Sequence, residues 1–198
     1  MSTPLVLASA SPRRRELLSI LGLPFEVTPS RVDEQHQTGE SPEAFVVRTA
    51  RDKGREVASR LSDAVVVSAD TIVTIDGGIL GKPVDRPDAI RMLETLSGRE
   101  HAVMTAVSVA SVTRGTPGPV FEGVERTRVW FSPITRPTIE DYVAREDVMD
   151  KAGAYAIQGF AATFIPRIDG NYANVVGLPL PLIVDLLSRH GVPCVTSS

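Results

Sequence analysis

Apolar residues along the chain follow two patterns: short continuous runs, and stretches in which they recur every three or four positions. A short run rich in Val and Ile is typical of a buried strand, and the second spacing is typical of one face of a helix. The strongest run spans residues 64–75. Strands are predicted at residues 5–8, 25–28, 64–75, 102–112, 120–131 and 161–168.

Capping residues mark the helix boundaries. Ser11-Pro12 and Ser41-Pro42 each place a hydroxyl at the N-cap and a proline at the first helical position. Gly22 and Gly98 stand just past the ends of two helices, where a left-handed residue ends a helix. Helices are predicted at residues 12–21, 42–61, 87–96, 138–145 and 179–189.

The order of these elements indicates the fold class. Helices and strands alternate at first, and then two long strands follow one another with residues 113–119 as their connector. This order predicts an α/β fold with a mixed sheet. We find no repeat and no clear linker, so residues 1–198 are assigned to a single domain. The connector is the place where a boundary could fall.

Composition and charge exclude several classes of protein. The chain has 198 residues, 42% hydrophobic and 23% charged, which is typical of a soluble globular protein. A net charge of −3 gives no overall basic field for nucleic acid, so an anion must be met by a local cluster. No apolar run reaches about 18 residues, and the charges around Ala8-Ser9-Ala10 follow it, unlike those of a signal peptide. We expect a cytoplasmic protein with no membrane partner.

Cysteine, histidine and lysine are all rare in this chain. The single cysteine excludes a disulfide within the chain, and the three histidines lack the spacing of zinc ligands. Of 21 basic residues, three are lysines: Lys53, Lys82 and Lys151. Lysine is a compact point charge that arginine does not replace, so Lys53 and Lys82 are candidates for positions that need one. The alternative is that three lysines remain by chance.

The segment from Ser9 to Arg15 has the properties of a phosphate site. A strand ends and a helix begins there, so free backbone N–H groups and the positive end of the helix dipole lie together. Hydroxyls and three consecutive arginines add to the same place. Arginines are unfavourable at a helix N-terminus unless an anion compensates them. The alternative is an ordinary capped helix with a solvated basic first turn.

Three acidic residues are candidates for the chemistry. Asp70 lies in an otherwise apolar strand, where a carboxylate is costly unless it is paired or bound to metal. The alternative is an Asp that caps a turn. Asp33 and Glu34 are adjacent in a predicted loop, and because neighbours in an extended chain point to opposite sides, at most one of them faces a site. A fully solvated loop is the alternative there.

Two further segments suit a nucleotide. Lys82 stands between Gly81, which allows close backbone approach, and Pro83, which stiffens the exit. Residues 151–159 surround a Tyr and Gln158 with small side chains, and the amide of Gln158 offers both a donor and an acceptor to a base edge. Together with a hard cation on the carboxylates, these features predict a nucleotide phosphohydrolase that uses a metal such as Mg²⁺.

Several motifs follow one another along the chain. They are Leu-Ala-Ser-Ala-Ser-Pro-Arg-Arg (7–14), Ala-Asp-Thr-Ile-Val (69–73), Gly-Lys-Pro (81–83), Asp-Lys-Ala-Gly-Ala-Tyr-Ala-Ile-Gln-Gly (150–159) and Val-Gly-Leu-Pro-Leu (176–180). With these motifs in this order, the chain resembles the Maf family over residues 5–187. The resemblance implies a nucleoside triphosphate pyrophosphatase that releases a monophosphate and pyrophosphate with Mg²⁺ or Mn²⁺. It also implies a fold similar to the inosine triphosphatases, with an elongated twisted sheet flanked by helices, a cleft between two lobes, and a homodimer.

The same resemblance implies roles for individual residues. Asp70 is the general base or a metal ligand, and Lys82 is the second catalytic residue. Glu34 or Asp33 completes the metal site, although Asp33 departs from the Glu that is common at its position. The residues expected to hold the triphosphate are Ser9, Arg13, Arg14, Lys53 and Lys82.

Three positions bear on the substrate. A branch of the family that handles 7-methyl-GTP has Trp after the Ser-Pro, Gln after the Asp, and Glu in the late motif. The chain has Arg13, Thr71 and Gln158 there, which favours the branch for dTTP and UTP. A neutral amide can pair with a pyrimidine edge, whereas a carboxylate suits the positive ring of 7-methylguanine. Modified pyrimidine nucleotides stay an open alternative.

Two rival functions come from other classes. One is a non-catalytic nucleotide-binding regulator of cell division, which would release its nucleotide intact. The other is a nucleic-acid binder that uses Arg13–Arg15 and a helix face with Arg48, Arg51 and Arg55. Few aromatic residues and a negative net charge argue against the second, and we expect no nucleic-acid partner.

Overall fold

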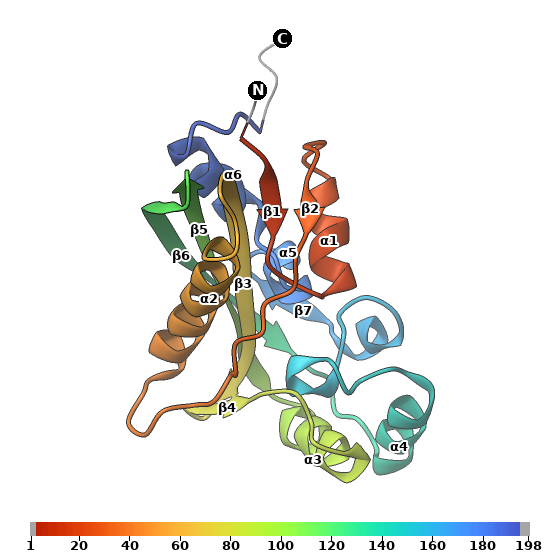
Figure 1. Ribbon diagram of the computed structural model, residues 1–198. Helices are drawn as coiled ribbons and strands as arrows, with labels where there is room; N and C mark the ends of the chain where they lie inside the picture. Colours follow the sequence, from red (N-terminus) through yellow and green to blue (C-terminus); the bar gives the residue numbers. More distant parts are fainter. Residues whose placement is uncertain (1–2, 195–198) are drawn as a thin grey trace. The chain divides into compact units, whose positions relative to one another are not determined.

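The computed structural model describes residues 3–194, and Figure 1 gives the course of the chain. The chain folds into two compact units. Unit 1 comprises the described residues up to Asp70, Thr105–Glu125, and the described residues from Gly177 onward. Unit 2 comprises Thr71–Met104 and Arg126–Val176. The assignment of residues 1–198 to one domain stays a prediction.

The strands follow the order β2-β1-β3-β5-β6-β7, and β4 pairs with β3. Their bounds are β1 Leu5–Leu7, β2 Glu26–Val27, β3 Ala64–Ile75, β4 Gly78–Leu80, β5 Glu100–Thr113, β6 Thr116–Trp130 and β7 Arg167–Asp169. β1 is parallel to β2 and β3, whereas β3 with β4 and β6 with β7 are antiparallel. The fold is therefore a mixed α/β fold, as the order of elements predicted.

In unit 1, helices connect the parallel strands and flank them (Figure 1). α1 (Pro12–Ser19) lies between β1 and β2 in the chain, and α2 (Pro42–Ala58) lies between β2 and β3. Both begin as the sequence indicates: the Ser11 hydroxyl accepts from the Arg14 N–H, and the Ser41 hydroxyl accepts from the Ala44 N–H. The last helix of unit 1 is α6 (Leu180–Arg189).

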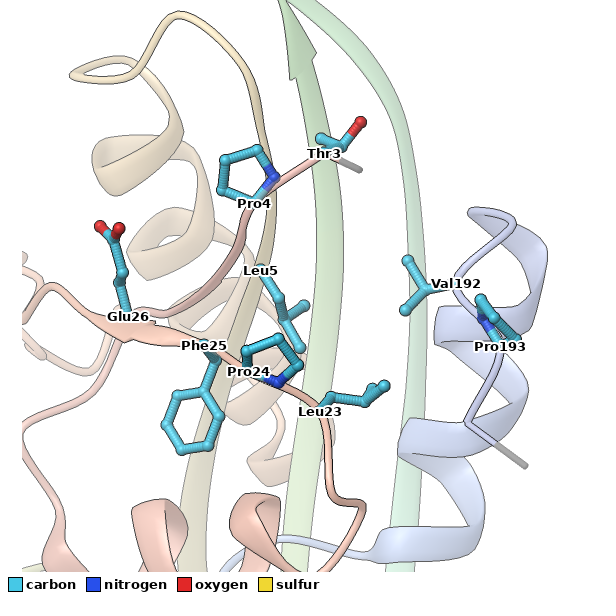
Figure 2. A pocket seen from close by; sticks show the side chains of 9 residues that line it. All are labelled: Thr3, Pro4, Leu5, Leu23, Pro24, Phe25, Glu26, Val192 and Pro193. Carbon is cyan, nitrogen blue, oxygen red and sulfur yellow. The ribbon is translucent and has the colours of Figure 1, made fainter. Parts of the chain in front are cut away.

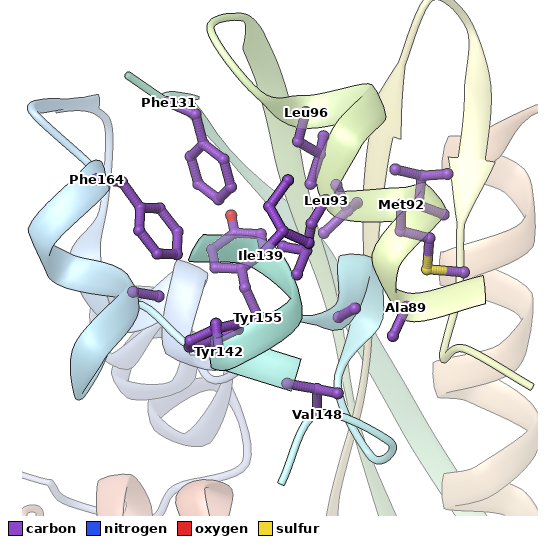
Figure 3. Packing of buried hydrophobic residues seen from close by; sticks show 14 of the residues in the cluster. Ala89, Met92, Leu93, Leu96, Phe131, Ile139, Tyr142, Val148, Tyr155 and Phe164 are labelled. Carbon is purple, nitrogen blue, oxygen red and sulfur yellow. The ribbon is translucent and has the colours of Figure 1, made fainter. Parts of the chain in front are cut away.

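Unit 2 packs around a core of aliphatic side chains into which several aromatic rings are set (Figure 3). Its helical elements are α3 (Arg86–Leu96), α4 (Arg136–Arg145), η1 (Ala152–Ala154), η2 (Phe160–Phe164) and α5 (Tyr172–Val176). Phe131 meets Tyr155 edge-on at 4.9 Å between ring centroids and Phe164 at 5.1 Å. Nε2 of buried His101 lies 2.7 Å from the Tyr155 hydroxyl. Burial lowers the pKa of His101 to about 4, so this imidazole is neutral near pH 7.

One strand prediction was wrong. Residues 161–168, expected as a strand, form the 3₁₀ helix η2 followed by β7. Ala161 and Phe164 are buried while the two residues between them are exposed, which is a helical spacing and not a strand alternation. Gly159, with φ of 80°, starts the turn and accepts a hydrogen bond from the Ala162 N–H.

The connector between the two long strands is shorter than predicted. Residues 113–119 were expected as a loop, but Arg114 and Gly115 alone make the turn, with φ of 49° and 72°. Two consecutive positive φ angles suit a tight hairpin whose twist matches its strands. β7 pairs with the far end of β6, at Arg128–Trp130. Pro117 and Pro119, near the start of β6, therefore lie towards the edge of the sheet, where proline is tolerated. The short elements β4 and α5 were not predicted.

α2 approaches β3 closely at a glycine. A Cβ atom on Gly54 would lie 2.6 Å from the Ser68 hydroxyl oxygen. That hydroxyl lies 2.7 Å from the Ala50 carbonyl oxygen and 3.2 Å from that of Ser108, so it is fixed by its own bonds. The absence of a side chain at Gly54 therefore sets the spacing of helix and strand next to Lys53.

We expect Gly54→Ala to lower the free energy of unfolding by about 1–3 kcal/mol, because the new methyl displaces the Ser68 hydroxyl. Ser68→Ala removes the oxygen that clashes, so the double variant should be more stable than the sum of the two single changes implies, by at least about 0.5 kcal/mol. Urea unfolding of the four proteins measures this coupling. Ala44→Gly, on the exposed start of α2, reports helix propensity alone. Strict additivity would contradict the close approach.

Candidate active site

Asp70 lies inside β3, with strand on both sides of it. The alternative of an Asp that caps a turn is therefore wrong. The residue is 4% exposed, and most of the other residues in the strand are apolar and buried. A buried carboxylate needs a compensating charge or hydrogen bonds.

Lys53 on α2 supplies that compensation. Its ammonium donates to Oδ1 of Asp70 at 2.8 Å, and Oε1 of Glu34 lies at the same distance of 2.8 Å from Nζ. Lys53 is itself 7% exposed. One buried ammonium thus joins two carboxylates from segments far apart in the sequence.

The loop before α2 carries Glu34 to this place. Arg48 on α2 forms two bonds to Glu40, Nε to Oε1 at 2.6 Å and Nη2 to Oε2 at 2.8 Å, and it also donates to the Gln35 carbonyl at 2.9 Å. The bond from Arg48 lowers the pKa of Glu40 to about 2. The loop is therefore held on α2 immediately after Glu34.

The two adjacent acids have different partners. Glu34 pairs with Lys53, whereas the exposed Asp33 accepts a hydrogen bond from Nε2 of Gln35 at 2.9 Å. The structure brings Glu34 to Asp70 through Lys53. It places Asp33 with a neighbour in its own loop.

Arg14, at the start of α1, donates hydrogen bonds to three protein oxygens. Nε donates to the Gly177 carbonyl at 2.9 Å, and Nη1 donates to the Ala69 carbonyl at 2.7 Å and to Oγ of Ser9 at 3.4 Å. Burial lowers the pKa of the Arg14 guanidinium, and the charges of Asp70 and Glu34 oppose that shift. This arginine therefore fixes the backbone beside Asp70, a role that the sequence did not suggest.

The other residues expected around a phosphate in unit 1 belong to the same turn. Ser9 is buried, and its hydroxyl accepts from the Ser11 N–H at 3.2 Å. Arg13 is half-buried in the first turn of α1, and its charge lowers the pKa of the neighbouring Arg14, although burial lowers it more. A hydroxyl, two guanidinium groups and the N-terminus of α1 therefore lie in one segment beside β3.

The remaining predicted residues lie in unit 2. Thr71 follows Asp70 in β3, and Lys82 is exposed after β4. Gln158 is exposed just before η2. The Gly153 N–H donates to the Gly81 carbonyl at 3.0 Å, which joins the Gly-Lys-Pro segment to residues 151–159. The third lysine, Lys151, pairs with Asp150 at 2.6 Å.

The donor set of unit 1 fits a divalent metal. Asp70 and Glu34 each place a carboxylate oxygen 2.8 Å from Nζ of Lys53. Mg²⁺ commonly binds through one or two carboxylates together with substrate phosphates. Across residues 3–194, no group of three or more His, Cys, Asp or Glu side chains is arranged to hold a metal ion. A metal here would therefore need ligands from a nucleotide or from water.

Other surfaces of unit 1 do not join this site. A cavity of about 420 Å³ lies beside β1 and β2, and Figure 2 shows the side chains that line it. Its lining is mostly apolar and includes none of the predicted site residues. The lining residues are Thr3, Pro4, Leu5, Leu23, Pro24, Phe25, Glu26, Val192 and Pro193.

On the basic face of α2, Arg48 pairs with Glu40 and Arg51 pairs with Glu122, so this face is partly neutralised. In the described part of the chain, no helix is long and apolar enough to cross a bilayer.

Comparison with known proteins identifies the family. The family described as Maf-like protein matches residues 4–190. A dTTP/UTP pyrophosphatase of Moorella thermoacetica is 50% identical over 188 residues, 95% of each chain, and one of Geobacter sulfurreducens is 50% identical over 187 residues, 94% of this chain and 96% of the relative. A nucleoside-triphosphatase / dITP/XTP pyrophosphatase from Mycobacterium abscessus, solved by crystallography, has a TM-score of 0.46, 18% identity and coverage of 95% and 94%. The chain belongs to the Maf family.

Proposed function

We propose that this protein hydrolyses nucleoside triphosphates, dTTP and UTP in preference, to the monophosphate and pyrophosphate. The observation that carries the proposal is the buried Lys53–Asp70 pair, which places a carboxylate and an ammonium beside the basic start of α1. Relatives of nearly equal length and about half-identical sequence bear the name dTTP/UTP pyrophosphatase.

Positive charge in unit 1 is placed to meet the triphosphate. Arg13 binds phosphate oxygens, the positive end of the α1 dipole favours their negative charge, and Lys53 lies at the adjoining carboxylates. Phosphoryl transfer is accelerated mainly by positioning and by neutralisation of the charge on the phosphate oxygens. Arg14 keeps Asp70 in place through the Ala69 carbonyl.

Asp70 orients and deprotonates the water. Lys53 donates a hydrogen bond to Oδ1 of Asp70. We therefore assign Oδ2 as the oxygen that accepts the proton of the water. The water oxygen forms a bond to the α-phosphorus, the bond from that phosphorus to the bridging oxygen breaks, and pyrophosphate leaves. Asp70 and Glu34 would hold a Mg²⁺ or Mn²⁺ ion, which neutralises phosphate charge and polarises the phosphorus–oxygen bonds when it is bound.

Further parts of the proposal rest on the resemblance to the family. They are a catalytic role for Lys82, contacts of Thr71 and Gln158 with the nucleotide, a homodimer and a cytoplasmic location. The chief alternatives are a regulator that binds nucleotide without hydrolysis and a preference for 7-methyl-GTP.

The first test is pyrophosphate release from dTTP, UTP, CTP, GTP, ITP and 7-methyl-GTP, with Mg²⁺, with Mn²⁺ and with EDTA. We expect turnover of dTTP and UTP that depends on the metal, because the substrate's charge must be neutralised. A preference for 7-methyl-GTP would overturn the interpretation of Arg13, Thr71 and Gln158. Tight binding without turnover of any nucleotide would favour the regulator.

Asp70→Asn should lower kcat about 10²–10⁴-fold, the usual contribution of a general base, while nucleotide binding stays measurable. Turnover and calorimetric titration with a non-hydrolysable dTTP analogue separate the two effects. Asp141→Asn, on the exposed surface of α4, is the matched control and should keep full activity. Near-normal turnover by a folded Asp70→Asn protein would remove Asp70 from the reaction.

Gln158→Glu should change the choice of base, because a carboxylate repels the acceptor groups of a pyrimidine edge and favours a positively charged ring. We expect the ratio of kcat/KM for dTTP to that for 7-methyl-GTP to fall at least tenfold. Gln37→Glu, in an exposed loop, controls for added negative charge. An unchanged ratio would exclude Gln158 from base selection.

A further inference from the structure

We infer that Lys53 is an internal counter-ion that keeps Asp70 and Glu34 from binding a divalent cation until a nucleotide arrives. Metal and triphosphate then bind together and not in sequence. This inference rests on the proposed function, because it assigns the metal to the same carboxylates.

The ammonium stands where the metal would stand. Nζ of Lys53 lies 2.8 Å from Oδ1 of Asp70 and 2.8 Å from Oε1 of Glu34, so the two oxygens are at most twice that distance apart. Mg²⁺ binds oxygen at about 2.0–2.1 Å, so a single ion would need these oxygens within about 4.2 Å of each other. A small approach of the two carboxylates would suffice, but an ion and the ammonium cannot occupy the same point.

The charges of the cluster already balance without a metal. Asp70 and Glu34 carry two negative charges, and Lys53 and Arg14 carry two positive ones. Arg14 is close enough for both carboxylates to act on its pKa. A divalent ion added alone would therefore leave an excess of two positive charges in a buried place, which is strongly unfavourable.

A bound triphosphate removes this obstacle. Lysine has a flexible four-carbon stem and three donors, so the ammonium of Lys53 can turn from the carboxylates to phosphate oxygens. The divalent ion then takes the carboxylates, and every charge keeps a partner. If a metal ion displaced Lys53 when no nucleotide was bound, the ammonium would lose its pairs with Asp70 and Glu34. Because Lys53 is largely buried, that loss would be costly.

The experiment measures metal binding without turnover. Mn²⁺ is titrated into the full-length protein, and the electron paramagnetic resonance signal of free Mn²⁺ is followed with and without a dTTP analogue whose α,β-bridge is methylene. Wild type should bind Mn²⁺ weakly alone and at least tenfold more tightly with the analogue, after the Mn²⁺ that the analogue binds without protein is subtracted. Lys53→Met should bind Mn²⁺ at least tenfold more tightly than wild type when no nucleotide is present.

Matched variants identify the charge as the cause. Lys53→Arg keeps the positive charge and should bind Mn²⁺ alone as weakly as wild type. Asp70→Asn in the Lys53→Met background should abolish the gain, and Arg145→Met, at an exposed ion pair on α4, should leave binding unchanged. If Lys53→Met is too unstable to titrate, its thermal transition should be restored by Mn²⁺, whereas Mn²⁺ should not raise the Tm of wild type.

Two results would overturn the inference: equally tight Mn²⁺ binding by wild type and Lys53→Met without nucleotide, or no Mn²⁺ binding and no stabilisation by Mn²⁺ in Lys53→Met. The proposed function fails on different evidence, namely the absence of pyrophosphate release from every nucleotide. A protein that turns over dTTP yet binds Mn²⁺ alone would keep the function and lose the counter-ion.

Discussion

The buried ion pair between Lys53 and Asp70 is the constraint on which unit 1 depends. A carboxylate inside an apolar strand is stable only with a partner, and the partner comes from a helix that must approach the strand closely. Gly54 allows that approach, because its missing side chain leaves room for the Ser68 hydroxyl. Gly54 and Ser68 thus help to bring the ammonium of Lys53 to the carboxylate of Asp70.

The same constraint explains the segments on either side of the pair. Arg48 and Glu40 hold the loop that brings Glu34 to Lys53, and the bond from Arg48 lowers the pKa of Glu40. Arg14 ties the start of α1 to the carbonyls of Ala69 and Gly177. Segments far apart in the chain are therefore fixed around Asp70 by charged hydrogen bonds, which are stronger than neutral ones.

Sequence reasoning succeeded where local signals decide the structure. The run of Val and Ile gave the bounds of β3, and the Ser-Pro pairs gave the starts of α1 and α2, because capping and strand propensity act over a few residues. It failed at residues 161–168, where tertiary packing selected a 3₁₀ helix from an apolar run. The need for a partner at Asp70 was foreseen, but no local signal names a lysine 17 positions earlier.

The carboxylates also bear on the choice between an enzyme and a regulator. A protein that only binds triphosphates gains from positive charge and loses from every carboxylate near the phosphates. Unit 1 nevertheless places Asp70 and Glu34 at the ammonium beside its basic turn, and Asp70 is buried, where charge is costly. That arrangement weakens simple anion binding. It is useful where a carboxylate must hold a cation or take a proton from water, which is what hydrolysis requires.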